Sequence, residues 1–207
     1  MKPLHGKILN RIARAGSGRV FTPKDFLDFA GRDVTDQTLS RLVRSGALQR
    51  LGRGLYFVPR RNDSLGVDIP PNLDEVADAV ARQTGSRVAP SGAVAANRLG
   101  LSTQVPAKPI YLSDGRTRQV RVGKYVLQIK HVPPKEFPVG NRKSAMVFQA
   151  LRFLGQDAAS DKVVKTIRAA LSQADKKQLL ADAKYATDWL CELARKIASV
   201  REPASDG

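Results

Sequence analysis

The segment DVTDQTLSRLVRSGALQRLGRGLYFVP, residues 33–59, predicts a short helix followed by a basic hairpin. Leu39, Leu42 and Val43 recur at helical spacing and form one apolar stripe, which a helix would bury against a core. The opposite face of the same helix carries polar residues: Gln37, Ser40, Arg41 and Arg44. One face is therefore suited to packing, and the other to contact with a partner.

The ends of this helix and the hairpin after it can also be predicted. Thr35 is the expected N-cap of the helix, and Gly46 is its expected end. Two runs of strand-forming residues follow at 48–51 and 55–58, on either side of a glycine-arginine-glycine turn centred on Arg53. This pattern predicts two antiparallel strands with an arginine at the tip of their turn.

Two further helices are expected before this segment, at 5–15 and at about 23–30, with a short strand at 19–21 between them. The second of these helices has a strong start, because Thr22 can cap it and Pro23 suits the first helical position. The resulting order is that of a winged helix-turn-helix. In that fold the third helix enters the major groove of DNA and the hairpin, or wing, lies against the DNA backbone.

A winged helix-turn-helix would place the polar face of the third helix against DNA bases. Gln37, Arg41 and Arg44 can form bidentate hydrogen bonds with adenine and guanine edges. Lys24, Arg50 and Arg53, which lie outside this helix, are expected to bind DNA phosphates. The complete set of expected DNA-binding residues is Lys24, Thr35, Gln37, Thr38, Ser40, Arg41, Arg44, Arg50 and Arg53. Two other interpretations stay open: a basic face that is only solvated, and a winged helix used for protein contact.

The charge of the chain agrees with a polyanionic partner. The 207 residues carry a formal net charge of +16, with a pI near 10.5. Residues 1–61 hold 13 Lys and Arg against 4 Asp, so more than half of the excess lies in the first third of the chain. We therefore expect two domains, a DNA-binding domain at 1–62 and a C-terminal antitoxin or effector domain at 63–207.

Several classes of protein are excluded by composition. No run of about 18 apolar residues is present, and the N-terminus lacks the apolar core of a signal peptide. We therefore expect a cytoplasmic protein that is not associated with a membrane. A single cysteine, Cys191, excludes an internal disulfide, and with only His5 and His131 besides it the chain cannot form an ordinary structural zinc site. No metal and no cofactor are expected.

The rest of the chain predicts a mixture of helices and short strands. Residues 60–72 are expected to form an extended connection, and 73–84 a helix capped by Asn72 and ended by Gly85. Another helix is expected after Ser91. Three strand-like runs, at 110–112, 119–122 and 125–132, predict a small antiparallel sheet.

The C-terminal part predicts helices only. They are expected at 143–154, after Ser160, as a short piece around 179–180, and around Leu190, Leu193 and Ile197. The expected fold class is therefore α+β: an N-terminal winged helix-turn-helix followed by a C-terminal α+β domain with a small antiparallel sheet and a helical end.

An enzyme is not expected, although one catalytic alternative exists. Asp114, Gln128 and Lys130 loosely resemble the metal site of PD-(D/E)xK nucleases, but glutamine binds a metal ion less well than a carboxylate does. A turn already explains Asp114 and the glycine after it. Ser91 lacks the G-x-S-x-G setting of a hydrolase nucleophile.

Three stretches together carry a resemblance to a known family. They are GRVFTPKDFLDF at 18–29, LSRLVRSGALQRLGRGLYFVP at 39–59 and, most specifically, SGAVAANRLGLSTQVPAKPIYLSDG at 91–115. The chain resembles the AbiEi-type antitoxins of bacterial type IV toxin-antitoxin systems, which act in abortive infection and phage defence. The resemblance covers about residues 5–155, and the helices after Gly155 lie outside its motifs.

This resemblance implies a specific function. The N-terminal winged helix would bind inverted repeats of double-stranded DNA in its own promoter and repress the operon, as a monomer in solution or a dimer on DNA. The C-terminal domain would counteract a cognate nucleotidyltransferase-like toxin, with or without direct contact. The alternative is a general winged-helix transcriptional regulator whose C-terminal domain senses a ligand or forms oligomers.

Overall fold

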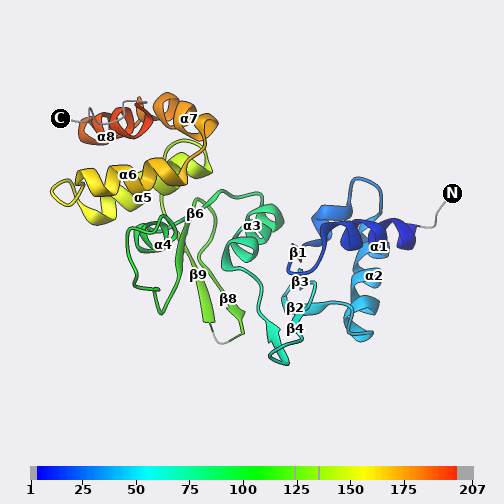
Figure 1. The fold of residues 1–207 in the computed structure, drawn as a ribbon. Helices are drawn as coiled ribbons and strands as arrows, with labels where there is room; N and C mark the ends of the chain where they lie inside the picture. The colour runs from blue at the N-terminus through cyan, green and yellow to red at the C-terminus, as the bar shows by residue number, and fades with distance from the viewer. Residues whose placement is uncertain (1–3, 124, 135, 200–207) are drawn as a thin grey trace. The chain divides into compact units, whose positions relative to one another are not determined.

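The computed structural model describes residues 4–123, 125–134 and 136–199 of the chain. Within these residues the fold is α+β, with eight α-helices and small antiparallel sheets (Figure 1). The chain forms two compact units that alternate along the sequence: Met1–Val88 with Ser113–His131, and Ala89–Leu112 with Val132–Gly207. A domain boundary between residues 62 and 63 stays a prediction.

The first unit begins with a helix, a strand, a short 3-10 helix, a second α-helix and a hairpin. These elements are α1 Leu4–Ala15, β1 Val20–Phe21, η1 Pro23–Phe26, α2 Arg32–Arg44, β2 Gln49–Gly52 and β3 Leu55–Phe57. The three strands form one antiparallel sheet in the order β1-β3-β2, with Val20 opposite Phe57 and Arg50 opposite Tyr56. Strand β3 is therefore central, and the hairpin tip lies at one end of this sheet.

The expected helix at about 23–30 is wrong in its extent, because only the 3-10 helix η1 forms there. Asp25 begins this helix by accepting a hydrogen bond from the Thr22 N–H (2.8 Å). The apolar pattern then breaks: Phe26 is fully buried, whereas Leu27 is 44% exposed. The residues after η1 form turns, and Ala30 still reaches the core.

The start of α2 also differs from its expected position. Gly31 is the N-cap and the helix begins at Arg32, so Thr35 lies in the first turn and not at the cap. Its hydroxyl donates to the Gly31 carbonyl (2.9 Å). The end of α2 is as expected, because the chain turns at Gly46 with a φ of +76°, a conformation that favours glycine.

A hydrophobic core holds α1, α2 and the sheet together. It consists of Ile8, Ile12, Phe21, Phe26, Ala30, Leu39, Leu42, Leu48 and Tyr56. Leu9 on α1 is not part of this core, and its side chain is 37% exposed. The apolar face of α2 is thus buried, which leaves its opposite face on the surface.

Two strand pairs and a helix complete the first unit. The expected extended connection is in fact a hairpin, β4 Arg60–Asn62 paired with β5 Val67–Ile69. Helix α3, Leu73–Thr84, begins and ends where the sequence predicts: the Asn72 side chain accepts from the Asp74 N–H (2.8 Å), and Gly85 is left-handed. Strands β8 Arg118–Val122 and β9 Tyr125–His131 form a further antiparallel pair.

The second unit consists mainly of helices. Its elements are β6 Val88–Pro90, α4 Gly92–Arg98, β7 Ile110–Ser113, α5 Arg142–Leu154, α6 Asp161–Ala170, α7 Gln173–Ala183 and α8 Asp188–Ala198. Helices α4 and α5 lie very close together, since a Cβ at Gly92 would be 2.5 Å from the Phe153 Cβ and 2.9 Å from the Gln149 carbonyl. Close packing therefore explains part of the small-residue content of segment 91–115.

Helix α7 is longer than the short piece expected around 179–180. Ser172 caps it in a reciprocal arrangement with Asp175, and Leu179 is buried in the core shared with α5, α6 and α8. Among the described residues, every helix is too short or too polar to cross a lipid bilayer.

Candidate nucleic-acid interface

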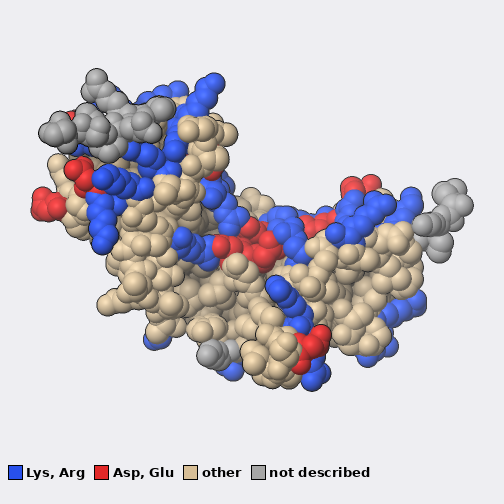
Figure 2. All heavy atoms as spheres, in the orientation of Figure 1, with Lys and Arg blue, Asp and Glu red and all other residues tan. Residues whose placement is uncertain are grey.

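The exposed face of α2 carries the residues that the sequence assigns to base contact. Gln37, Arg41 and Arg44 are all exposed, as is Ser40 beside them. Arg41 and Arg44 belong to the last turn of the helix. Figure 2 shows lysine and arginine side chains along the edge of the molecule that α2 forms. Within the described ranges 4–123, 125–134 and 136–199, neither arginine is ion-paired with a carboxylate.

Two of the expected DNA-binding residues lie on the other face of α2. Thr35 is 0% exposed and Thr38 is 3% exposed. The Thr38 hydroxyl lies 3.5 Å from His5 Nδ1 on α1, so it contributes to the contact between the two helices. Both threonines therefore have a packing role in this structure, and their side chains are not presented to a partner.

The cations expected at phosphates are all exposed. Lys24 lies on η1, Arg50 on β2, and Arg53 in the turn between β2 and β3. The hairpin has an irregular register between Arg50 and Gly52, which is a bulge on the β2 strand. The exposed cations thus come from three elements around the exposed face of α2.

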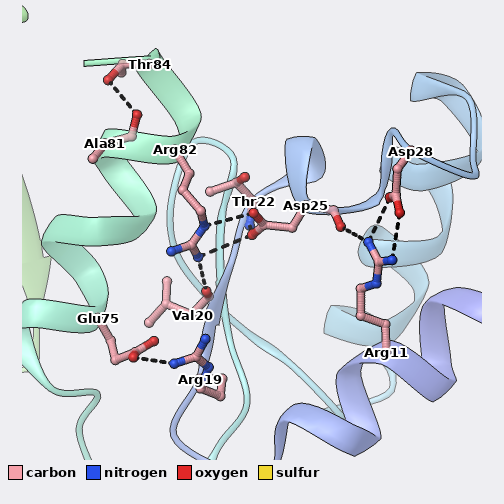
Figure 3. Close-up of polar contacts among 10 residues, drawn as sticks. All are labelled: Arg11, Arg19, Val20, Thr22, Asp25, Asp28, Glu75, Ala81, Arg82 and Thr84. Carbon is pink, nitrogen blue, oxygen red and sulfur yellow. Dashed lines mark hydrogen bonds and ion pairs between the residues drawn. The ribbon is translucent and has the colours of Figure 1, made fainter. Parts of the chain in front are cut away.

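Helix α3 is fastened to the sheet and to η1 by two arginines (Figure 3). Arg82 Nε donates to Asp25 Oδ1 (2.8 Å), and its Nη2 donates to the Val20 carbonyl (2.8 Å). Near the other end of α3, Glu75 forms an ion pair with Arg19. Arg82 is 38% exposed and Asp25 only 17%, so this ion pair is partly shielded from water. The position of α3 relative to η1 is therefore well defined.

A hollow of about 620 Å³ lies between α2, the β2–β3 hairpin, α3 and β8. Four arginines line it: Arg32, Arg50, Arg53 and Arg118. Arg32, Arg118 and Gln83 were not predicted from the sequence as members of this site. The alternation of arginines in RTRQVR at 116–121 indicates a charged strand, but no local signal places that strand beside the hairpin.

The tip of the hairpin is held by α3. Gln83 Nε2 donates to the Arg53 carbonyl (2.7 Å). Gly54, the next residue, has a φ of +69°, and a Cβ there would lie 2.5 Å from Gln83 Nε2. The glycine therefore serves both the turn conformation and the close approach of the glutamine side chain. This contact fixes the backbone of residue 53 while leaving its guanidinium on the surface.

Asp114 and Lys130, which were considered as a nuclease metal site, have structural contacts or face solvent. The Asp114 carboxylate accepts hydrogen bonds from the Arg87 N–H (2.7 Å) and from Arg87 Nε (2.8 Å). The side-chain hydrogen bond from Arg87 lowers the pKa of Asp114 below its ordinary value. Lys130 is exposed on β9, and His131 Nδ1 lies 2.9 Å from the Gly115 carbonyl. Asp114 thus orders the turn that precedes β8.

No group of three or more His, Cys, Asp and Glu residues that could hold a metal ion exists among the described residues. Cys191 is partly buried, and its Sγ donates to the Ala183 carbonyl (2.8 Å), which ties α8 to the end of α7. Ser91 is the N-cap of α4. The positions of Cys191 and Ser91 are thus accounted for by packing and helix capping.

The chain belongs to a family of unknown function, DUF6088, whose model matches residues 7–179. The match extends from α1 into α7, so it includes the exposed face of α2, the hollow and the first helices after Gly155. No curated protein matches the chain.

The contact between α3 and η1 is open to a stability test. We expect Arg82→Ala to lower the free energy of unfolding by about 1–2 kcal/mol, since it removes hydrogen bonds to a partly shielded carboxylate and to a carbonyl. The measurement is urea denaturation followed by circular dichroism. Arg32→Ala is the matched control, because its i,i+4 pair with Asp36 is exposed and contributes at most about 0.5 kcal/mol. Equal effects of the two substitutions would contradict the assigned contact.

Alanine substitutions at two hairpin glycines, Gly52 and Gly54, test the contact between the hairpin tip and Gln83. Gly54→Ala should destabilise the protein by about 1–2 kcal/mol, because alanine disfavours positive φ and the new Cβ displaces Gln83. Gly52→Ala should be close to neutral, since no atom lies within 4 Å of a Cβ at that position and its φ is not positive. Thermal unfolding of both variants provides the measurement, and a neutral Gly54→Ala would refute the described contact.

Proposed function

We propose that this protein is a DNA-binding antitoxin whose first unit contains a winged helix-turn-helix. The order α1-β1-η1-α2-β2-β3 is compatible with that fold, with η1 in the place of the second helix and the β2–β3 hairpin as the wing. The observation that carries the proposal is the exposed face of α2. Gln37, Arg41 and Arg44 lie there beside hairpin arginines that have no ion pair within the part of the chain that the structure describes.

In this function α2 enters the major groove. Arg41 and Arg44 donate to the O6 and N7 acceptors of guanine, and Gln37 pairs with an adenine edge. Lys24, Arg50 and Arg53 bind phosphates, which set the register of the helix on the duplex without reading sequence. Thr35 and Thr38, which are buried, take no direct part. The net charge of +16 supports association with a polyanion at a rate that falls with salt.

The antitoxin part of the proposal rests on the sequence resemblance. The stretch SGAVAANRLGLSTQVPAKPIYLSDG is its most specific element, and it provides α4 and β7 of the second unit. The target would be a nucleotidyltransferase-like toxin produced from the same operon. The DNA-binding unit would repress that operon at inverted repeats in its promoter.

The DNA-binding part predicts a specific loss of affinity. Each of Arg41→Ala and Arg44→Ala should weaken binding to a duplex from the chain's own promoter roughly tenfold or more, with a much smaller effect on an unrelated duplex. Fluorescence anisotropy of the full chain measures both. Arg195→Ala on α8 removes the same charge from an exposed site in the second unit and should leave promoter affinity within about twofold.

A structural role of the same arginines gives a different result. Cations in the last turn of a helix favour its dipole, so a purely structural role would reduce the free energy of unfolding and leave DNA affinity unchanged. Unchanged promoter binding by both variants would therefore remove Arg41 and Arg44 from the proposed interface.

The antitoxin part predicts a growth phenotype. Expression of the nucleotidyltransferase-like gene beside this one should arrest bacterial growth, and co-expression of the present chain should restore it. A variant that carries both Arg41→Ala and Arg44→Ala should still restore growth when expressed from an unrelated promoter, because neutralisation is assigned to the second unit. Growth curves provide the measurement. Promoter binding without any rescue would instead identify a general transcriptional regulator.

A further inference from the structure

The hollow between α2, the hairpin, α3 and β8 contains more positive charge than the proposed winged helix uses. Arg50 and Arg53 come from the hairpin and Arg32 from α2, whereas Arg118 comes from β8, far along the sequence. The hollow is thus a composite site, and one of its four cations lies outside the segment that forms the winged helix.

The charges in the hollow are poorly balanced by the protein itself. Arg32 is paired with Asp36 (2.7 Å), which is the one carboxylate in the lining. Across residues 4–123, 125–134 and 136–199, Arg50, Arg53 and Arg118 form no ion pair with a carboxylate. Like charges gathered in one concavity repel each other, and an anion bound among them relieves that repulsion. Guanidinium groups suit a phosphate in particular, because each can donate two parallel hydrogen bonds to its oxygens.

The walls of the hollow are held in place by contacts already described. The hydrogen bond from Gln83 fixes the backbone at Arg53, and Arg82 anchors the same helix on Asp25 and the Val20 carbonyl. The hairpin arginines therefore lie at a defined position in the first unit, where β8 also packs beside β2. Preorganisation of this kind lowers the entropy lost when a ligand binds.

The size of the hollow distinguishes between two sources of phosphate. At about 620 Å³ it is much larger than a single free phosphate ion needs. On the α2 side its lining is formed by Ser40 and Asp36, which are sequence neighbours of Gln37 and Arg41 on the face assigned to the major groove. Because α2 is the proposed major-groove helix, the hollow beside it lies within reach of a DNA strand.

We infer that this hollow binds a backbone phosphodiester of DNA, with Arg118 of β8 completing a clamp formed with Arg50 and Arg53 of the hairpin. The inference rests on the proposed function and extends it: the DNA contact surface includes a strand that follows α3. Arg118 adds affinity without sequence preference, because phosphate contacts position the protein and do not read bases. Gln83 acts as a positioning residue through the hairpin backbone.

The experiment compares Arg118→Ala and Arg118→Lys with the wild-type full chain by fluorescence anisotropy. Two duplexes of equal length are used, one from the chain's own promoter and one unrelated, over a range of salt concentrations. Arg116→Ala is the matched control, since Arg116 is an exposed arginine two residues away that does not line the hollow. Circular dichroism confirms that each variant is folded.

The expected result for Arg118→Ala is the loss of one phosphate contact on both duplexes. The slope of log affinity against log salt should become shallower by about 0.9, so the drop in affinity between about 50 and 200 mM salt shrinks by a factor of about 3.5. Arg118→Lys should keep the wild-type slope, because it keeps the charge. Arg116→Ala should match the wild type.

Three outcomes overturn the inference or its basis. If the wild type binds DNA and Arg118→Ala has the affinity and slope of Arg116→Ala, the clamp is wrong while the proposed function stands. If the wild type binds neither duplex, the proposed function fails and the clamp fails with it. If inorganic phosphate raises the melting temperature of the wild type but not of Arg118→Ala, while DNA affinity is equal for both, the hollow is a site for a free anion and not for DNA.

Discussion

The carboxylate of Asp25 organises the first unit. It accepts the Thr22 N–H and so begins η1, and it also accepts the Arg82 guanidinium and so holds α3. The main-chain carbonyl of the same residue accepts a hydrogen bond from Arg11 on α1. A carboxylate with 17% exposure is costly to leave without partners, so the contacts with Thr22 and Arg82 both matter for Asp25. Asp25 contacts Arg82 of α3, and the next residue of α3, Gln83, holds the hairpin tip beside the hollow.

Local signals predicted those elements whose ends are set by local chemistry. Helix α3 begins at an asparagine cap and ends at a left-handed glycine, and both residues were identified from the sequence. The strands of the β8–β9 pair were also predicted, because strand-like runs are present at 119–122 and 125–132. In these places the local conformational preference and the tertiary structure agree.

Prediction failed where tertiary contacts decide. Thr35 and Thr38 were expected among the DNA-binding residues, Thr35 also as the N-cap of the helix, yet both are buried in a helix that begins at Arg32. Threonine at such a position buries its methyl group and bonds its hydroxyl locally, as Thr35 does to the Gly31 carbonyl. The hollow could not be predicted from the sequence for another reason. Its lining extends from residue 23 to residue 118, and only the folded chain brings these positions together.

The hydrogen bond between Gln83 and the hairpin constrains the backbone at position 53 and not the side chain. Gln83 holds a main-chain oxygen, so the side chain at position 53 can change without moving the backbone that bears it. Different residues thus position the hairpin tip and contact its ligand. Gln83 and Gly54 are constrained by the hairpin geometry, whereas the side chain at position 53 is not.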